Sequence, residues 1–159
     1  MIIAVSSPID FKIGAEIIKA YQKTKFSHSL IIDNDGLIYQ ASHGFVNACH
    51  IQNFLSDNYL IKCYEIDDLL IDKLFLKQQL GKKYSKWQLV KIALKVICRK
   101  FTFGDNGDKA FICSEYAGKA IIPLRKRVND LTTPEQLDRM ILEYAQEISI
   151  KDALMRFYA

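Results

Sequence analysis

Features that would place the chain in a specialised class are scarce in its 159 residues. No apolar run approaches the ~20 residues that span a bilayer, so we expect no transmembrane segment. No set of side chains has metal-ligand spacing and no phosphate-binding glycine loop is present, so we expect no metal and no cofactor. The cysteines are widely spaced and form no CxxC pair, which argues against a zinc knuckle and a disulfide framework. They are Cys49, Cys63, Cys98 and Cys113.

Excess charge and targeting signals are lacking too. The formal net charge is only +4, so we expect no nucleic-acid partner. The first residues, MIIAVSSPIDFK, lack a basic start and have an apolar stretch of only about five residues, unlike a secretory signal. We therefore expect a cytoplasmic protein. The basic residues of segments 86–100 and 125–127 fit a solvated face, with an anionic lipid or wall polymer as the alternative.

The order of the predicted elements indicates a single α+β domain over residues 1–159, with a small antiparallel sheet packed against helices. MIIAV and YLIKCYEI read as strands. Ser6 or Ser7 is placed to cap a helix with Pro8 in its first turn, and an apolar stripe follows. Its members are Ile13, Ile17, Ile18 and Tyr21.

The second half of the chain is mostly helical in pattern. Residues 67–80 and 86–99 predict two helices separated by Gly81, and FICSEYAGKAII predicts the start of a buried helix. Thr133 followed by Pro134 is typical of a helix cap and first position, and the last ten residues also favour a helix. Residues 43–58 are expected to form a loop over a cleft.

SHSLIID and GLIYQAS read as two strands of a hairpin. Gly36 favours a three-residue loop with the glycine in the left-handed conformation, so that Leu30 opposes Gln40 and His28 opposes Ser42. Because side chains alternate, His28 and Gln40 then share a face as diagonal neighbours. Gln40 can accept a hydrogen bond from one imidazole nitrogen and leave the other for Cys113. A two-residue loop would place the pair on opposite faces.

Cys113 stands where a loop pattern changes to a helix pattern. Free N–H groups and partial positive charge at a helix start favour a thiolate and can form part of an oxyanion hole. An inert buried cysteine is the alternative. His28 opens an apolar strand and is placed to reach a cleft, although a lone histidine is more often structural, and His43 and His50 fit surface or turn positions. Glu115 fits a helix first turn rather than a catalytic role.

These segments, in this order, resemble a known family. They are SHSLIIDNDGLIYQASHGFV, LGKKYSKW, FICSEYAGKAI and the Thr133–Pro134 pair. They resemble the circularly permuted branch of the NlpC-like papain superfamily, in which the histidine strand precedes the cysteine helix. The resemblance covers roughly residues 1–140 and implies a papain-like fold of the permuted NlpC type.

By position, the resemblance makes Cys113 the nucleophile, His28 the base and Gln40 the residue that orients the ring. Tyr84 matches a tyrosine near the oxyanion site of related enzymes, and Ser114 joins it as an oxyanion or substrate-binding residue. The third position is often Glu or His in the family. Here it is a glutamine, which carries no charge but can still orient an imidazole.

The resemblance implies a cysteine hydrolase that cleaves an amide, ester or thioester bond through an acyl-enzyme. Its partners would be a peptide, a peptidoglycan fragment or a lipid acyl substrate. The lack of a secretory signal weakens the cell-wall interpretation unless the chain is phage- or virus-encoded. A catalytically inactive binding or virion-associated module stays open, as does a lipid acyltransferase like the lecithin:retinol acyltransferase type.

Overall fold

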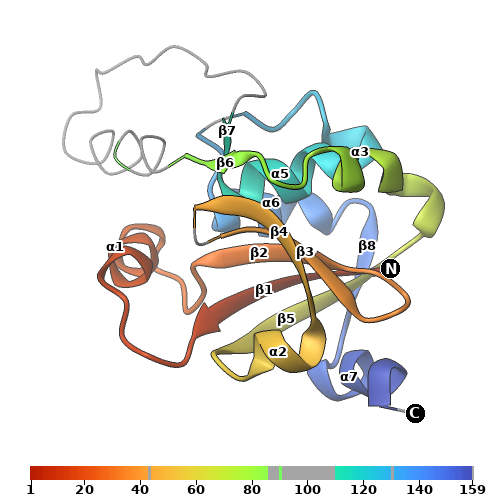
Figure 1. Cartoon of the computed structure of the whole chain (residues 1–159), viewed down its shortest axis with the longest axis horizontal. Coiled ribbons are helices and arrows are strands. Elements are labelled where there is room, and N and C mark those ends of the chain that lie inside the picture. Colours follow the sequence, from red (N-terminus) through yellow and green to blue (C-terminus); the bar gives the residue numbers. More distant parts are fainter. Residues whose placement is uncertain (43, 86–89, 91–109, 130, 159) are drawn as a thin grey trace.

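An eight-stranded sheet forms the frame of the described molecule (Figure 1). The computed structural model describes residues 1–42, 44–85, 90, 110–129 and 131–158. The strand order is β7-β6-β4-β3-β2-β1-β5-β8, and neighbours run antiparallel except for β6 and β7. The strands are β1 (Ile2–Pro8), β2 (His28–Ile32), β3 (Leu37–Ser42), β4 (Phe45–His50), β5 (Asn58–Ile66), β6 (Lys83–Tyr84), β7 (Ala110–Phe111) and β8 (Ala145–Ile148).

Helices cover both faces of this sheet. α3, α5 and α6 lie over one face, α2 and α7 lie over the other, and α1 stands beside the sheet (Figure 1). None of the described helices is long and apolar enough to cross a membrane. The helices are α1 (Ile13–Gln22), α2 (Ile51–Leu55), α3 (Lys73–Gln78), α5 (Cys113–Ala120), α6 (Pro134–Ile141) and α7 (Ile150–Tyr158), with short 3₁₀ turns η1 (Asp68–Leu70) and η3 (Ile122–Leu124).

Alternation along the central strands builds two apolar layers. Ile3 and Ile31 belong to the layer that contains α5 and α6, whereas Ile2 and Leu30 belong to the layer that contains α2 and α7. Side chains of adjacent residues point to opposite faces of a strand, so strands that are apolar throughout need cover on both sides. The α+β prediction is confirmed, although the sheet is larger than the small antiparallel one expected and includes a parallel pair.

Several predicted elements are confirmed. The strands at MIIAV and YLIKCYEI are β1 and β5, and the hairpin strands are β2 and β3. The predicted buried helix is α5, and the C-terminal helix is α7. Thr133 caps α6 in a capping box with Gln136, with Pro134 in the first turn.

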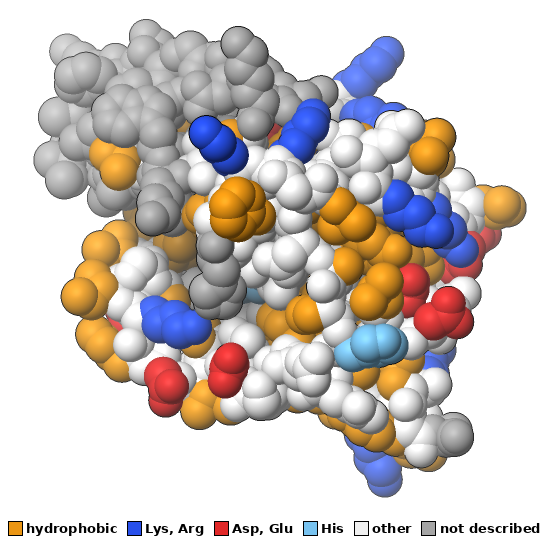
Figure 2. All heavy atoms as spheres, in the orientation of Figure 1, with side chains coloured by type: hydrophobic (Ala, Val, Ile, Leu, Met, Phe, Trp, Pro, Cys, Tyr) orange, Lys and Arg blue, Asp and Glu red, His pale blue; other side chains and the backbone are white. Residues whose placement is uncertain are grey.

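The helix predicted to begin after Ser6 or Ser7 begins instead at Ile13. Ser6, Ser7 and Pro8 extend β1 and pair with β5, so they cannot cap a helix. The predicted apolar stripe also faces solvent among the described residues, because Ile13 is 69% exposed and no residue of α1 is buried. Figure 2 shows hydrophobic side chains gathered over α1.

The prediction of a loop at 43–58 is wrong, because this stretch forms β4 and α2. Val46 is buried, and β4 pairs with β3 along its whole length. Gly44 has φ of 95° and makes the tight turn between the two strands. The predicted helix 67–80 is two pieces, η1 and α3, because Ile71 between them pairs with Ile121. β8 was not predicted. His43, Cys98 and the predicted helix 86–99 with its basic residues lie outside the described residues.

Candidate active site

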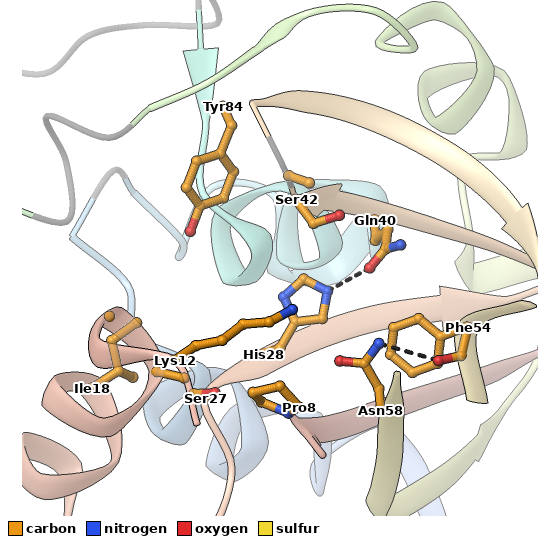
Figure 3. A pocket seen from close by; sticks show the side chains of 13 residues that line it. Pro8, Lys12, Ile18, Ser27, His28, Gln40, Ser42, Phe54, Asn58 and Tyr84 are labelled. Carbon is orange, nitrogen blue, oxygen red and sulfur yellow. Dashed lines mark hydrogen bonds between the residues drawn. The ribbon is translucent and has the colours of Figure 1, made fainter. Parts of the chain in front are cut away.

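The β2–β3 hairpin brings His28 and Gln40 together as predicted. Ile31 pairs with Tyr39, the register that a three-residue loop requires. Gly36 has φ of 76°, and its N–H donates to the Asp33 carbonyl at 3.1 Å. The imidazole Nε2 of His28 lies 2.7 Å from Oε1 of Gln40 (Figure 3). The hairpin therefore holds the ring through the neutral amide.

Gln40 is itself fixed in one orientation. It is buried, and its Nε2 donates to the sulfur of Cys49 at 3.6 Å. With the amide nitrogen turned to Cys49, the amide oxygen faces His28 and accepts from its Nε2–H. This tautomer leaves the lone pair on Nδ1 of the neutral imidazole. Nδ1 is the nitrogen that a general base would use.

The strands β2 and β3 separate on the far side of the Ile31–Tyr39 pair, where their described pairing ends. The Asp33 N–H donates across the hairpin to Leu37 O at 3.0 Å, and by strand alternation the Ser29 N–H points toward the same side. That N–H donates to the sulfur of Cys113. The start of α5 therefore delivers its thiol to the opening between the strands, against the residue that follows His28.

Cys113 is 3% exposed. Burial raises the pKa of its thiol, although the backbone N–H groups of Ser29, Ser114 and Cys113 act in the opposite direction. The expectation that the helix start favours a thiolate is therefore wrong for the resting site, because desolvation outweighs the donors. The same donors surround the position where negative charge would develop on sulfur.

Burial also governs His28. It lowers the pKa of the ring from 6.5 to about 4, with Gln40 opposing and the positive charge of Lys12 adding to the decrease. The ring stacks on Phe54 with a centroid separation of 6.4 Å and an interplanar angle of 24°. At neutral pH the thiol and the imidazole are both uncharged, so the resting site holds no ion pair between them.

Tyr84 and Ser114 both lie near Cys113. Burial, followed by the charge that Cys113 would carry, raises the pKa of Tyr84, so its hydroxyl stays protonated and able to donate. The Ser114 hydroxyl donates to the Thr132 carbonyl, and the Ser114 backbone N–H donates to the sulfur of Cys113. Glu115 is buried in the first turn of α5 and pairs with Lys119 at 2.9 Å, as suits a structural residue.

A pocket of about 260 Å³ lies beside this group, between α1 and the hairpin (Figure 3). His28, Gln40 and Tyr84 line it, whereas Cys113 is not among its lining residues. The other lining residues could not be expected from the sequence, because they come from separate elements that only the fold brings together. They are Pro8, Lys12, Gly14, Ala15, Ile18, Ser27, Ala41, Ser42, Phe54 and Asn58.

The described residues contain no cluster of His, Cys, Asp or Glu that could hold a metal ion. Comparison with protein-family models gave no match, and neither did comparison with curated proteins. The thiol of Cys113, the imidazole of His28 and the amide of Gln40 are therefore the groups of the described chain that bear on its function.

Proposed function

We propose that the chain is a cysteine hydrolase in which Cys113 attacks an acyl carbonyl and His28 transfers the protons. The observation that supports this proposal is a pair of hydrogen bonds made by neighbouring residues of β2, His28 and Ser29. A thiol that accepts backbone N–H groups lies against the residue after His28, and His28 donates to Gln40 at 2.7 Å. Nucleophile, base and orienting group are the three parts of a catalytic triad.

Acylation begins from the neutral pair. As the sulfur bonds to the carbonyl carbon, the thiol proton passes to Nδ1 of His28 and the carbonyl electron pair moves to oxygen. The N–H groups of Cys113 and Ser114 and the hydroxyl of Tyr84 donate to that oxyanion. The carbonyl then re-forms, and the leaving amine or alcohol departs with the proton from His28.

Deacylation reverses these roles. His28 takes a proton from water as the water oxygen bonds to the thioester carbon. The sulfur departs with the bonding pair and regains the proton, which releases the acid. An alcohol or amine in place of water would make the same site an acyltransferase. Gln40 holds the ring throughout by accepting from Nε2–H.

Acyl labelling tests the proposal directly. Incubation with 4-nitrophenyl acetate should release a burst of nitrophenol and leave one acetyl group on Cys113, located by mass spectrometry and removable by hydroxylamine. Cys113→Ala should lower turnover by at least about 10³-fold, because the nucleophile is gone. Cys63→Ala is the matched control, since Cys63 is a buried cysteine of β5 whose loss should leave labelling intact.

A non-catalytic module of the same fold is the alternative, and the 3% exposure of Cys113 favours it. In that case Cys113 packs against β2 and performs no chemistry. Equal labelling of the cysteines, or turnover unchanged in Cys113→Ala, would reject the hydrolase proposal. If labelling instead supports the hydrolase, turnover of acyl esters of increasing chain length can be compared with turnover of γ-linked and α-linked peptides. This comparison would separate lipid from peptide substrates.

A further inference from the structure

Lys12 is the one charged side chain among the described residues that line the pocket. It directly precedes α1, and Figure 3 shows its ammonium end lying across the pocket toward the ring of His28. The remaining described lining is apolar, amide, hydroxyl or imidazole. Lys12 therefore supplies the one side-chain charge that the described lining presents to a bound molecule.

The carbonyl of Lys12 accepts from the Glu16 N–H at 3.0 Å, but no described residue forms an ion pair or hydrogen bond with its ammonium. Three other lysines of the described chain have carboxylate partners: Lys19 pairs with Glu16, Lys62 with Asp138 and Lys73 with Asp68. Glu16 is the carboxylate nearest in sequence on α1, and it is committed to Lys19. The charge of Lys12 is therefore left for a group that enters the pocket.

Lys12 also opposes the chemistry proposed for this site. His28 must become an imidazolium when it takes the thiol proton, and a nearby positive charge disfavours that state. An anion that entered beside Lys12 would offset this effect and make proton transfer easier. Lys12 therefore opposes protonation of His28 in the empty pocket, and a negatively charged substrate bound beside it would remove this effect.

We propose that the pocket binds its acyl substrate through an anionic group, a carboxylate or a phosphate, that pairs with the ammonium of Lys12. The inference rests on the proposed hydrolase function for the identity of the ligand as an acyl substrate. Lys12 is then a specificity-determining residue, and neutral substrates of the same shape are poor ones. The apolar side chains of Ile18 and Phe54 contact the acyl chain in the same pocket.

Matched substrates test this. A carboxylate arm compares 4-(butyryloxy)benzoate with its methyl ester, and a phosphate arm compares dihexanoyl phosphatidate with dihexanoylglycerol. In the wild type, kcat/KM should favour the anionic member of at least one arm, and the arm that responds identifies the anion. Lys12→Met should reduce that preference roughly tenfold, Lys12→Arg should retain it, and Lys12→Glu should reverse it. Lys25→Met removes the same charge from a residue outside this pocket and should change nothing.

Binding to Cys113→Ala separates this inference from the hydrolase proposal, because no turnover is needed. Calorimetric titration with 4-(butyryloxy)benzoate and with dihexanoyl phosphatidate should show roughly tenfold weaker binding when Lys12→Met is added, for the anion that the pocket accepts. Binding of both anions that is independent of Lys12 would overturn the subsite even if the enzyme hydrolyses esters. Binding that depends on Lys12 in a chain with no hydrolytic activity would support the subsite and reject the hydrolase.

Discussion

The two helices that serve the site differ sharply in how they are held. Seven of the eight residues of α5 are buried, whereas none of the ten residues of α1 is. α5 packs on β2, β3 and α6, while α1 is tied to the rest through hydrogen bonds such as Lys19 Nζ to Ser7 Oγ at 3.3 Å. The proposed nucleophile Cys113 therefore lies on a helix fixed by packing, and Lys12 directly precedes a helix with little packing.

This difference assigns distinct tasks to the two sides. Triad geometry tolerates little error, so it suits a position that the core over-determines. Selection of a substrate tolerates adjustment, which suits an exposed helix. Variants on the packed side should impair all substrates alike, whereas variants on the α1 side should change which substrate is preferred.

The largest effect on the packed side beyond Cys113 is expected at Gln40. Gln40→Ala removes the acceptor for Nε2–H of His28, so the ring can turn, and kcat/KM should fall by about 10²-fold for charged and neutral substrates equally. Gln40→Glu keeps the acceptor and adds a negative charge, which should raise the pKa of His28 above about 4 and move the acid limb of the kcat/KM profile to higher pH.

Gln146→Ala is the control for these variants, since Gln146 lies on the edge strand β8, which β1 and β5 separate from the hairpin. It should leave both the rate and the pH profile unchanged. If Gln40→Ala lowered kcat/KM for anionic substrates alone, substrate selection would depend on the α5 side as well. The proposed difference between the α5 side and the α1 side would then be wrong.

A smaller effect should appear in stability as the pH falls. The pKa of His28 is about 4 in the folded chain against 6.5 for the free side chain. Because the folded value is the lower one, the unfolded chain binds the proton first. Stability from the neutral ring is complete above pH 6.5 and is lost as the pH falls toward 4, by about 2–3 kcal/mol.

Urea unfolding at pH 7.5 and pH 4.5 checks this, with His28→Gln as the reference that cannot titrate. The wild type should lose more stability than the variant over this interval, since the carboxylates contribute equally to both. Equal losses of stability in the wild type and in His28→Gln would mean that the ring of His28 is exposed to water in the folded chain, as the side chains of α1 are.

The smallest and most direct test compares two glycines. A Cβ on Gly118 of α5 would lie 2.6 Å from Cγ1 of Val128 and 3.2 Å from Cδ1 of Leu137, whereas a Cβ on Gly14 of α1 would have nothing within 4 Å. Gly118→Ala should cost about 1–3 kcal/mol by overpacking. Gly14→Ala should change the free energy of unfolding by no more than about 0.5 kcal/mol. Equal effects, measured by urea titration, would contradict the contrast in packing.

Local signals in the sequence were sufficient for the elements that carry the chemistry. One glycine determines the hairpin loop, the loop determines the register, and the register places His28 and Gln40 on one face. The cap at Thr133 is equally local, because its bonding partner is three residues away.

The failures have a different physical origin. The apolar stripe of α1 predicted burial, but periodicity does not say whether a partner surface exists, and Ile13 and Ile17 are exposed. Whether the pKa of the Cys113 thiol is raised or lowered depends on how completely the rest of the chain excludes water from it. Lys12 meets the pocket only through tertiary packing, and no spacing in the sequence connects it to His28.

The opening between β2 and β3 places a sulfur where a main-chain oxygen would otherwise complete the ladder. Cys113 therefore also has a structural role, since the backbone N–H of Ser29 depends on its sulfur for an acceptor. Folding alone would therefore constrain this position, because any replacement for Cys113 would have to supply an accepting atom to the Ser29 N–H.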